Sequence, residues 1–184
     1  VSIDGVPANN VAQWDGNSWS ALGQGMGRLD WENKFTAEGE VNALALDGTT
    51  LYAGGDFVIA GDVTANAVAQ WDGNSWSALD GGVTRIDGNG NPESGIVKAL
   101  AVAEGTLYVG GWFTQAGATA ANHVAAWNGA AWSALGVGVK PEQFFSEPPV
   151  FALAVSDDGL YVGGRFVNAG NQAIGLLARW DGAN

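Results

Sequence analysis

Short apolar stretches separated by turn residues recur along the chain, and in one unit they predict four β-strands. In the clearest unit these stretches are residues 41–46, 51–53, 68–71 and 76–79. Side chains alternate between the two faces of a strand, so we expect Ala69 and Trp71 to share one face. Asp47-Gly48, a frequent hairpin turn, separates the first two stretches. The pattern predicts a four-stranded antiparallel sheet and regular structure that is entirely β.

The same succession of stretches returns with a period near 50 residues. A Trp-x-Gly triplet marks each return, and its tryptophans are 57, 56 and 53 residues apart: Trp14, Trp71, Trp127 and Trp180. A fixed period of this length indicates one supersecondary unit used repeatedly, here about three and a quarter times. We interpret residues 1–184 as one repeat domain, made of a partial unit (1–22), complete units (41–79 and 97–135) and an incomplete unit (150–184).

Paired tryptophans flank the turn between the third and fourth stretch of a unit. Gly16-Asn17, Gly73-Asn74 and Gly129-Ala130 fit two-residue turns that begin with glycine. This register would set Trp14 opposite Trp19, Trp71 opposite Trp76, and Trp127 opposite Trp132. Aromatic cross-strand pairs stabilise hairpins, and we expect the tryptophan of each third strand to be largely buried. A carbohydrate platform is the alternative, but strict repetition favours the structural role.

The repeated letters resemble those of a known family. A strand ending in Gly-Gly, then an aromatic-Asp turn and a second tryptophan, is similar to the kelch repeat; the letters here are LYAGG at 51–55, Trp71-Asp72-Gly73 and Trp76. Similar arrays occur in bacterial surface proteins and fungal cortical marker proteins. Together with four short strands per repeat, the resemblance implies a β-propeller of four-stranded antiparallel blades. Most kelch domains carry more units than this chain.

Composition narrows the possible partners. The formal net charge of −12, from 19 acidic and 7 basic residues, lacks the basic surface that nucleic-acid binding needs. Acidity favours solubility, with a cation-dependent surface as the alternative. No apolar run reaches about 18 residues, so we expect no transmembrane segment. The chain has no cysteine and begins with Val, so we expect no disulfides, and a processed product or an excerpt of a longer chain.

The segments between units, residues 23–40, 80–96 and 136–149, vary in length and letters and are expected to be exposed, mobile loops. Loops on a rigid scaffold often carry function. These hold aromatic residues that the repeat does not require: Trp31, Phe35, Phe144 and Phe145. They are our candidate binding residues, with packing of the loop onto its sheet as the alternative.

A weak calcium site is a further candidate. Oxygen donors at alternate positions, separated by glycine, let a loop wrap a hard cation. Asp87, Asn89, Asn91 and Glu93 have this spacing. The complete twelve-residue calcium-loop pattern is missing, and an ordinary Gly/Asn turn explains the same letters. We expect no other cofactor.

Catalytic chemistry has little support in the sequence. The single histidine, His123, is more typical of a structural or exposed residue, and no Gly-x-Ser-x-Gly elbow accompanies it. The kelch-like oxidases use copper with histidines and a Cys-linked tyrosine, which this chain cannot supply. A pair of glycosidase carboxylates stays possible, although nothing distinguishes one pair. We therefore expect a non-enzyme.

Two functions follow as hypotheses. The first is a non-catalytic extracellular or cell-surface repeat module that presents its variable loops for protein binding or assembly. The second is a glycan-binding or glycan-active propeller domain that uses loop aromatics and carboxylates. Because the first and last units are incomplete, we expect the terminal strands to pair with other protein, either flanking repeats or a second copy.

Overall fold

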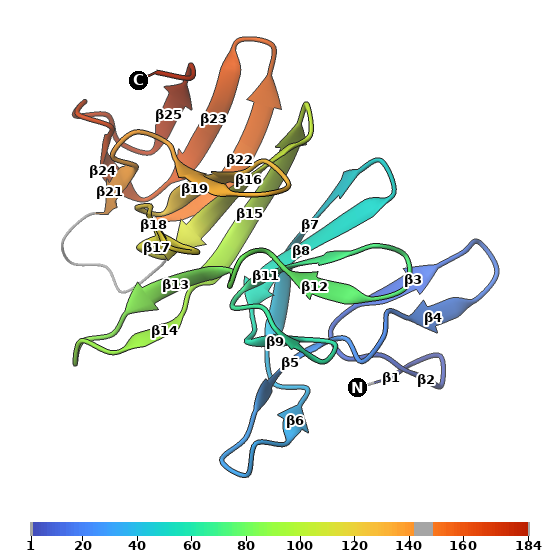
Figure 1. Cartoon of the computed structure of the whole chain (residues 1–184). Coiled ribbons are helices and arrows are strands. Elements are labelled where there is room, and N and C mark those ends of the chain that lie inside the picture. The colour runs from blue at the N-terminus through green and yellow to red at the C-terminus, as the bar shows by residue number, and fades with distance from the viewer. Residues whose placement is uncertain (1, 142–148, 184) are drawn as a thin grey trace.

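The computed structural model describes residues 2–141 and 149–183, and regular structure within them is entirely β (Figure 1). The predicted all-β class is confirmed. No helix in these residues is long and apolar enough to cross a membrane.

The repeat units fold as antiparallel sheets in the predicted strand order. The first complete sheet contains β7 (Glu40–Asp47), β8 (Thr50–Asp56), β11 (Val68–Trp71) and β12 (Trp76–Ala78). The second contains β15 (Ile96–Ala103), β16 (Thr106–Trp112), β19 (Val124–Trp127) and β20 (Trp132–Ala134). The last sheet has three strands: β22 (Val150–Ser156), β23 (Gly159–Gly164) and β25 (Leu177–Trp180). At the N-terminal end, β3 (Ala12–Trp14) and β4 (Trp19–Ala21) form a hairpin.

The hairpin register predicted from the tryptophans is confirmed. Trp71 lies opposite Trp76 with ring centroids 5.3 Å apart, and the other two pairs have the same arrangement. The aspartate of the Trp-Asp-Gly triplet forms the turn, because Oδ1 of Asp72 accepts the backbone N–H groups of Asn74 and Ser75 at 2.8 and 2.7 Å. Gly73 has a φ of 99°, which favours glycine.

The segments between units fold as hairpins rather than as irregular loops. β5 (Met26–Leu29) pairs with β6 (Phe35–Thr36), and β13 (Val83–Ile86) pairs with β14 (Pro92–Ser94). Met26 and Val83, at the start of these hairpins, are fully buried. These segments therefore contain regular strands and a few buried residues that we did not expect, although the tips of the hairpins are exposed as predicted, and their mobility stays a prediction.

Each of these hairpins pairs with a second, smaller hairpin, which follows the second strand of the next four-stranded sheet. β5 pairs with β9 (Ile59–Ala60), whose partner is β10 (Val63–Thr64). In the next unit β13 pairs with β17 (Gln115–Ala116), whose partner is β18 (Thr119–Ala120). These short strands pair through backbone groups, which do not require a particular pattern of side chains. The sequence pattern therefore did not predict these sheets. The remaining strands are β1 (Ser2–Ile3), β2 (Val6–Pro7), β21 (Val139–Pro141) and β24 (Phe166–Ala169).

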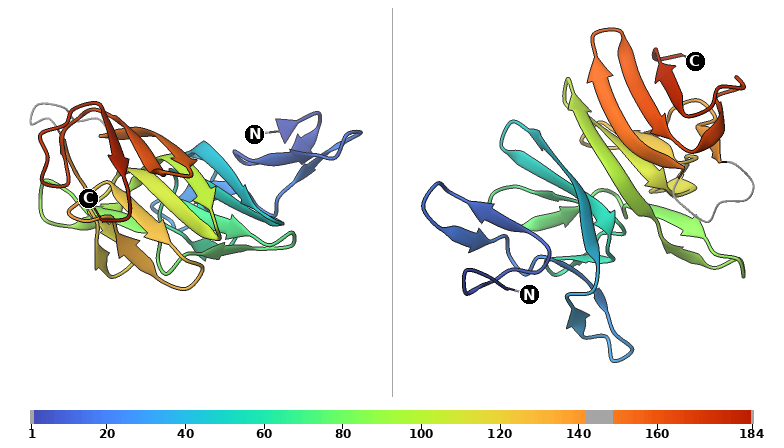
Figure 2. Two further views of the ribbon diagram at one scale, coloured as in Figure 1. Left: turned by 90° about the horizontal axis from the view of Figure 1, so that it is seen from above. Right: turned by 180° about the vertical axis from the view of Figure 1, so that it is seen from behind.

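The core lies between consecutive sheets. Strand β15 contacts both β7 and β22, so the first strands of the three sheets lie side by side (Figure 1, Figure 2). Phe57, Phe113 and Phe166 occupy the same repeat position, and each is buried in one of three apolar clusters. The repeats therefore build the core by stacking, and the hairpin β3–β4 and the last sheet lie at opposite ends of the array (Figure 2).

The most deeply buried tryptophan of the first complete unit is not the one that was expected. Trp14, on the third strand of its unit, is 49% exposed, and Trp71 is half-buried. The prediction holds for Trp127, which is buried. In contrast, Trp76 on a fourth strand is only 4% exposed. Its counterpart Trp132 is also buried. Contacts between units, rather than strand alternation, decide this burial.

Candidate binding surfaces

The aromatic residues predicted to bind a ligand do not converge. Trp31 lies in the turn of the β5–β6 hairpin and is 89% exposed. Phe35 is half-buried, and its ring lies over Gly27, where an added Cβ would be 2.7 Å from the ring. Between residues 2 and 141 no ring contact joins Trp31 to Phe35. Phe144 and Phe145 lie outside the described residues.

The four residues predicted to bind calcium belong to the β13–β14 hairpin. Oδ1 of Asp87 accepts the backbone N–H groups of Asn89 and Asn91, both at 2.8 Å. The hydrogen bond from Asn91 is the main cause that holds the pKa of Asp87 below its ordinary value. Glu93 instead forms an ion pair with Arg85 at 2.8 Å. Both carboxylates of the predicted calcium site are therefore already bonded to protein groups within an ordinary hairpin.

The β5–β6 hairpin, one repeat earlier, has the same turn. Oδ1 of Asp30 accepts the backbone N–H groups of Glu32 and Lys34 at 2.8 and 2.9 Å. The role of Asp87 in its turn therefore needs no cation. Within the part of the chain that the structure describes, no group of three acidic, histidine or cysteine side chains could hold a metal ion. Calcium binding at Asp87 stays a prediction.

The histidine lies in the core, at a position with a strained backbone. His123 is buried and has a φ of 68°, close to the values of its repeat counterparts Asn10 (67°) and Ala67 (71°). Burial lowers the pKa of His123 to about 4, so the imidazole is neutral near pH 7. A neutral ring on this repeated turn indicates a structural residue.

An apolar face is uncovered at the N-terminal end of the array. Leu44 and Leu46, on β7, are 53% and 66% exposed. At the same positions of the next sheet, Leu100 and Val102 pack against the core cluster between the sheets. The N-terminal unit supplies only short hairpins, so no described residue covers Leu44 and Leu46 in the same way.

A tryptophan fixes each complete sheet to the unit before it. The indole Nε1 of Trp76 donates to the carbonyl oxygen of Leu22 at 2.8 Å, and Trp132 donates to Leu79 at the same distance. Gly61 forms one wall around Trp76, because an added Cβ would lie 3.3 Å from its Cδ1. We call this arrangement of a leucine carbonyl, a glycine and apolar side chains around an indole the tryptophan slot.

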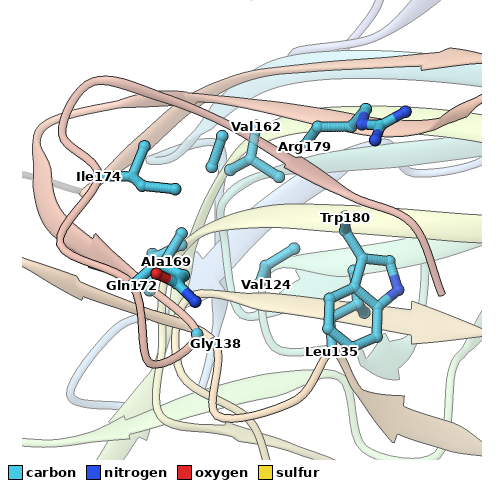
Figure 3. A pocket seen from close by; sticks show the side chains of 12 residues that line it. Val124, Leu135, Gly138, Val162, Ala169, Gln172, Ile174, Arg179 and Trp180 are labelled. Atoms are coloured by element: carbon cyan, nitrogen blue, oxygen red, sulfur yellow. The ribbon is translucent and has the colours of Figure 1, made fainter. Parts of the chain in front are cut away.

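The last sheet, of which residues 149–183 supply three strands, has a hollow at the corresponding place. Its volume is about 140 Å³, and its walls come from β19, β21, β23, β25 and the turn after β24 (Figure 3). An added Cβ at Gly170 would meet no atom within 4 Å. The walls include the residues Val124, Leu135, Val139, Ala169, Gly170 and Trp180.

Sequence reasoning missed the slots because it assigned the fourth-strand tryptophans only to their own hairpins. One signal could have found them: Leu22, Leu79 and Leu135 recur in step with Gly61, Gly117 and Gly170. The leucine of the preceding unit supplies the carbonyl, and the glycine of the tryptophan's own unit supplies the space.

Comparisons with known proteins give no family for this chain. No protein-family model matches it, and no curated protein matches it. Among solved structures, the crystal structure of the computationally designed Ika4 protein matches over 77% of this chain and 92% of that chain, with 15% sequence identity and a TM-score of 0.31. A similarity this weak carries no argument about fold or function.

Proposed function

We propose that the chain is a non-catalytic, kelch-like repeat module, located outside the cell or on its surface, that binds protein through the ends of its array and its inter-unit hairpins. Its sheets would be blades of a β-propeller. Side-by-side first strands and four-stranded antiparallel sheets support this architecture. The location rests on the resemblance to surface-protein repeats alone.

The observation that carries the proposal is the uncovered face of β7. Complete burial of a leucine side chain contributes roughly 1.5–3 kcal/mol, and Leu44 and Leu46, which are 53% and 66% exposed, forgo part of this free energy. Their counterparts Leu100 and Val102 are packed by a neighbouring unit. A surface with this shape and chemistry is suited to another unit of the same kind.

The opposite end of the array offers the complementary surface. Leu177, on β25, is 61% exposed, whereas its counterparts Val68 and Val124 are buried between units. The two ends are therefore the two halves of the contact that already joins neighbouring sheets. A second copy of the chain is the partner that carries both halves, in a head-to-tail arrangement.

Sedimentation velocity over a range of protein concentrations tests the proposal. Wild-type protein should self-associate, and the double variant Leu44→Glu/Leu46→Glu should sediment as a folded monomer. Ile86→Glu is the matched control, because Ile86 is similarly exposed but lies on the β13–β14 hairpin. Wild-type protein that stays monomeric would contradict self-assembly.

Glycan binding is the second candidate, and the exposure of Trp31 favours it. Aromatic side chains that project into solvent suit stacking against sugar rings, but Trp31 has no aromatic neighbour among the described residues. A glycan array with wild-type protein and Trp31→Ala tests this candidate. Turnover of any glycan by the wild type would contradict the non-catalytic assignment.

A further inference from the structure

We propose that Asn89 is a site of spontaneous covalent modification, at which its side-chain amide is converted to the carboxylate of aspartate or isoaspartate. Asparagine followed by glycine is the pair most prone to this reaction, because glycine has no Cβ to hinder the approach of its backbone nitrogen to the side chain. The chain contains two such pairs, Asn89-Gly90 and Asn128-Gly129. Their surroundings differ, and the difference favours reaction at the first.

The reaction needs only the chain and water. The backbone nitrogen of Gly90 gives its proton to hydroxide and attacks Cγ of Asn89. The N–Cγ bond forms, the Cγ–Nδ2 bond breaks, and Nδ2 takes a proton from water and leaves as ammonia. Water then opens the cyclic imide at either carbonyl carbon and leaves a carboxylate, whose proton goes to the ammonia. One opening gives aspartate, and the other gives isoaspartate, in which the main chain runs through Cγ.

Asn89 lies where water and space are available. Asn89 and Gly90 are exposed at the tip of the β13–β14 hairpin, which projects from the sheets (Figure 1). Glycines flank Asn89 on both sides, and an added Cβ at Gly88 or Gly90 would meet no atom within 4 Å. The side chain of Asn89 therefore has room to turn over the backbone, and solvent reaches both reacting groups.

The side-chain carbonyl of Asn89 accepts no hydrogen bond among residues 2–141 and 149–183. The carboxylate of Asp87 interacts with this side chain, and because an ionised carboxylate only accepts hydrogen bonds, it binds the NH₂ end of the amide. The N–H of Gly90 donates to the carbonyl oxygen of Asp87 at 3.1 Å, near the long end of the normal range. The attacking nitrogen is therefore held by one long hydrogen bond, and the attacked carbon is not anchored through its oxygen.

The second pair is equally exposed but firmly held. Asn128 is exposed, and Gly129 has the same φ of 89° as Gly90. However, Oδ1 of Asn128 accepts the backbone N–H groups of Ala130 and Ala131 at 3.0 and 2.8 Å. This turn joins two strands whose paired tryptophans are buried. Rotation of the Asn128 side chain toward the nitrogen of Gly129 breaks both hydrogen bonds, so the reaction there is slow.

The modification changes the charge of a hairpin that the proposed function counts among the binding elements. The charged residues of this hairpin are Arg85, Asp87 and Glu93, so its net charge is one negative. The new carboxylate at position 89 makes it two negative, and the isoaspartate product also lengthens the backbone of the turn. The chemistry needs no partner and stands whether or not the proposed function holds.

Peptide mass spectrometry of wild-type protein aged in mildly alkaline buffer tests the site, with Asn128 as the internal control. Replacement of NH₂ by OH raises the mass of the modified peptide, and chromatography separates its aspartate and isoaspartate forms. We expect Asn89 to react at least about tenfold faster than Asn128 in the folded protein and to give both products. In urea, where the turn of Asn128 is lost, the two rates should become similar. Circular dichroism verifies that the aged protein is folded.

Two variants assign the reaction to one residue. Anion-exchange chromatography should resolve a more acidic species that accumulates with time in the wild type. Asn89→Gln should stop its accumulation, because glutamine would have to close a larger ring. Asn128→Asp, which reproduces the turn of Asp72, should leave the rate unchanged. The proposal is overturned if Asn89 reacts no faster than Asn128 in the folded protein, if aspartate forms without isoaspartate, or if Asn89→Gln accumulates the acidic species at the wild-type rate.

Discussion

The indole nitrogen of Trp76 donates a 2.8 Å hydrogen bond to the carbonyl oxygen of Leu22, a residue of the preceding unit. Trp76 lies on the outermost strand of its own sheet, yet it is buried because the neighbouring unit surrounds it. Trp132 repeats the bond with Leu79. A residue that pairs within a hairpin therefore also joins consecutive units of the array.

Loss of this hydrogen bond should destabilise the protein. We expect Trp76→Phe to lower the free energy of unfolding by about 2 kcal/mol, because it removes a buried hydrogen bond and part of a buried ring. Urea unfolding at pH 7, followed by circular dichroism, measures the change.

Trp19→Phe is the control for that experiment. Trp19 has the same place in its hairpin, but no hydrogen bond of its indole is found among the described residues, and it is only half-buried. We expect a change within about 0.5 kcal/mol. Equal losses for the two variants would show that the hairpin pair, rather than the slot, supplies the stability.

Stability should fall in mild acid because of His123. Burial lowers the pKa of His123 from 6.5 to about 4, so the folded state favours the neutral ring. The stabilising contribution is complete above pH 6.5 and is lost as the pH falls from 6.5 to 4, with a total of about 3 kcal/mol. Urea midpoints at pH 7 and pH 4.5 measure the loss.

His123→Asn isolates the histidine in that experiment. Asn10 has nearly the same φ at the equivalent position, so asparagine fits the backbone there. We expect the variant to lose much less stability than the wild type between pH 7 and 4.5. An identical pH dependence would assign the effect to other groups.

The aspartates of the hairpin turns should lose their stabilising effect only in stronger acid, when their carboxylates become protonated. Backbone hydrogen bonds, first that from Ser75, hold the pKa of Asp72 below its ordinary value. Its contribution to stability is therefore present above about pH 4 and is lost as the pH falls through the folded pKa. In the third hairpin Asn128 makes the equivalent bonds to Ala130 and Ala131, at 3.0 and 2.8 Å.

These bonds predict different results for two substitutions at Asp72. Asp72→Asn should fold with near wild-type stability at pH 7 and lose the acid response of this turn, whereas Asp72→Ala should be destabilised at pH 7. Thermal unfolding at pH 7 and pH 3 distinguishes them. Equal stability of the two variants at pH 7 would refute the role of the side-chain oxygen.

Calcium should bind at most weakly at the β13–β14 turn. The carboxylate of Asp87 already accepts backbone N–H groups, and Glu93 is paired with Arg85. Calorimetry with Ca²⁺ should therefore give small heats, and any heat from this site should disappear in Asp87→Ala. A tight site whose heat is lost in this variant would contradict our interpretation of the turn.

Local repeats made much of the fold predictable. The letters of residues 41–79 indicated four strands in order, and the Gly-first turns indicated that Trp71 faces Trp76. The β5–β9 and β13–β17 pairings could not be predicted, because they join segments far apart in the chain through backbone groups.

The candidate sites were less predictable for the same reason. Trp31 and Phe35 are close in sequence, but one is at the tip of a hairpin and the other packs on Gly27. The hollow beside β25 depends on Leu135 and Gly170, which only the stacking of units brings together. Sequence periodicity identifies equivalent residues, whereas the partner of each residue in the neighbouring unit needs the structure.

Hydrogen exchange of the indole N–H groups, measured by NMR, tests most directly whether fourth-strand tryptophans join consecutive units. We predict slow exchange for Trp76 and Trp132, which donate to Leu22 and Leu79, and fast exchange for Trp19. Fast exchange at Trp76 and Trp132 in the folded protein, or equal rates at all three indoles, would contradict this prediction.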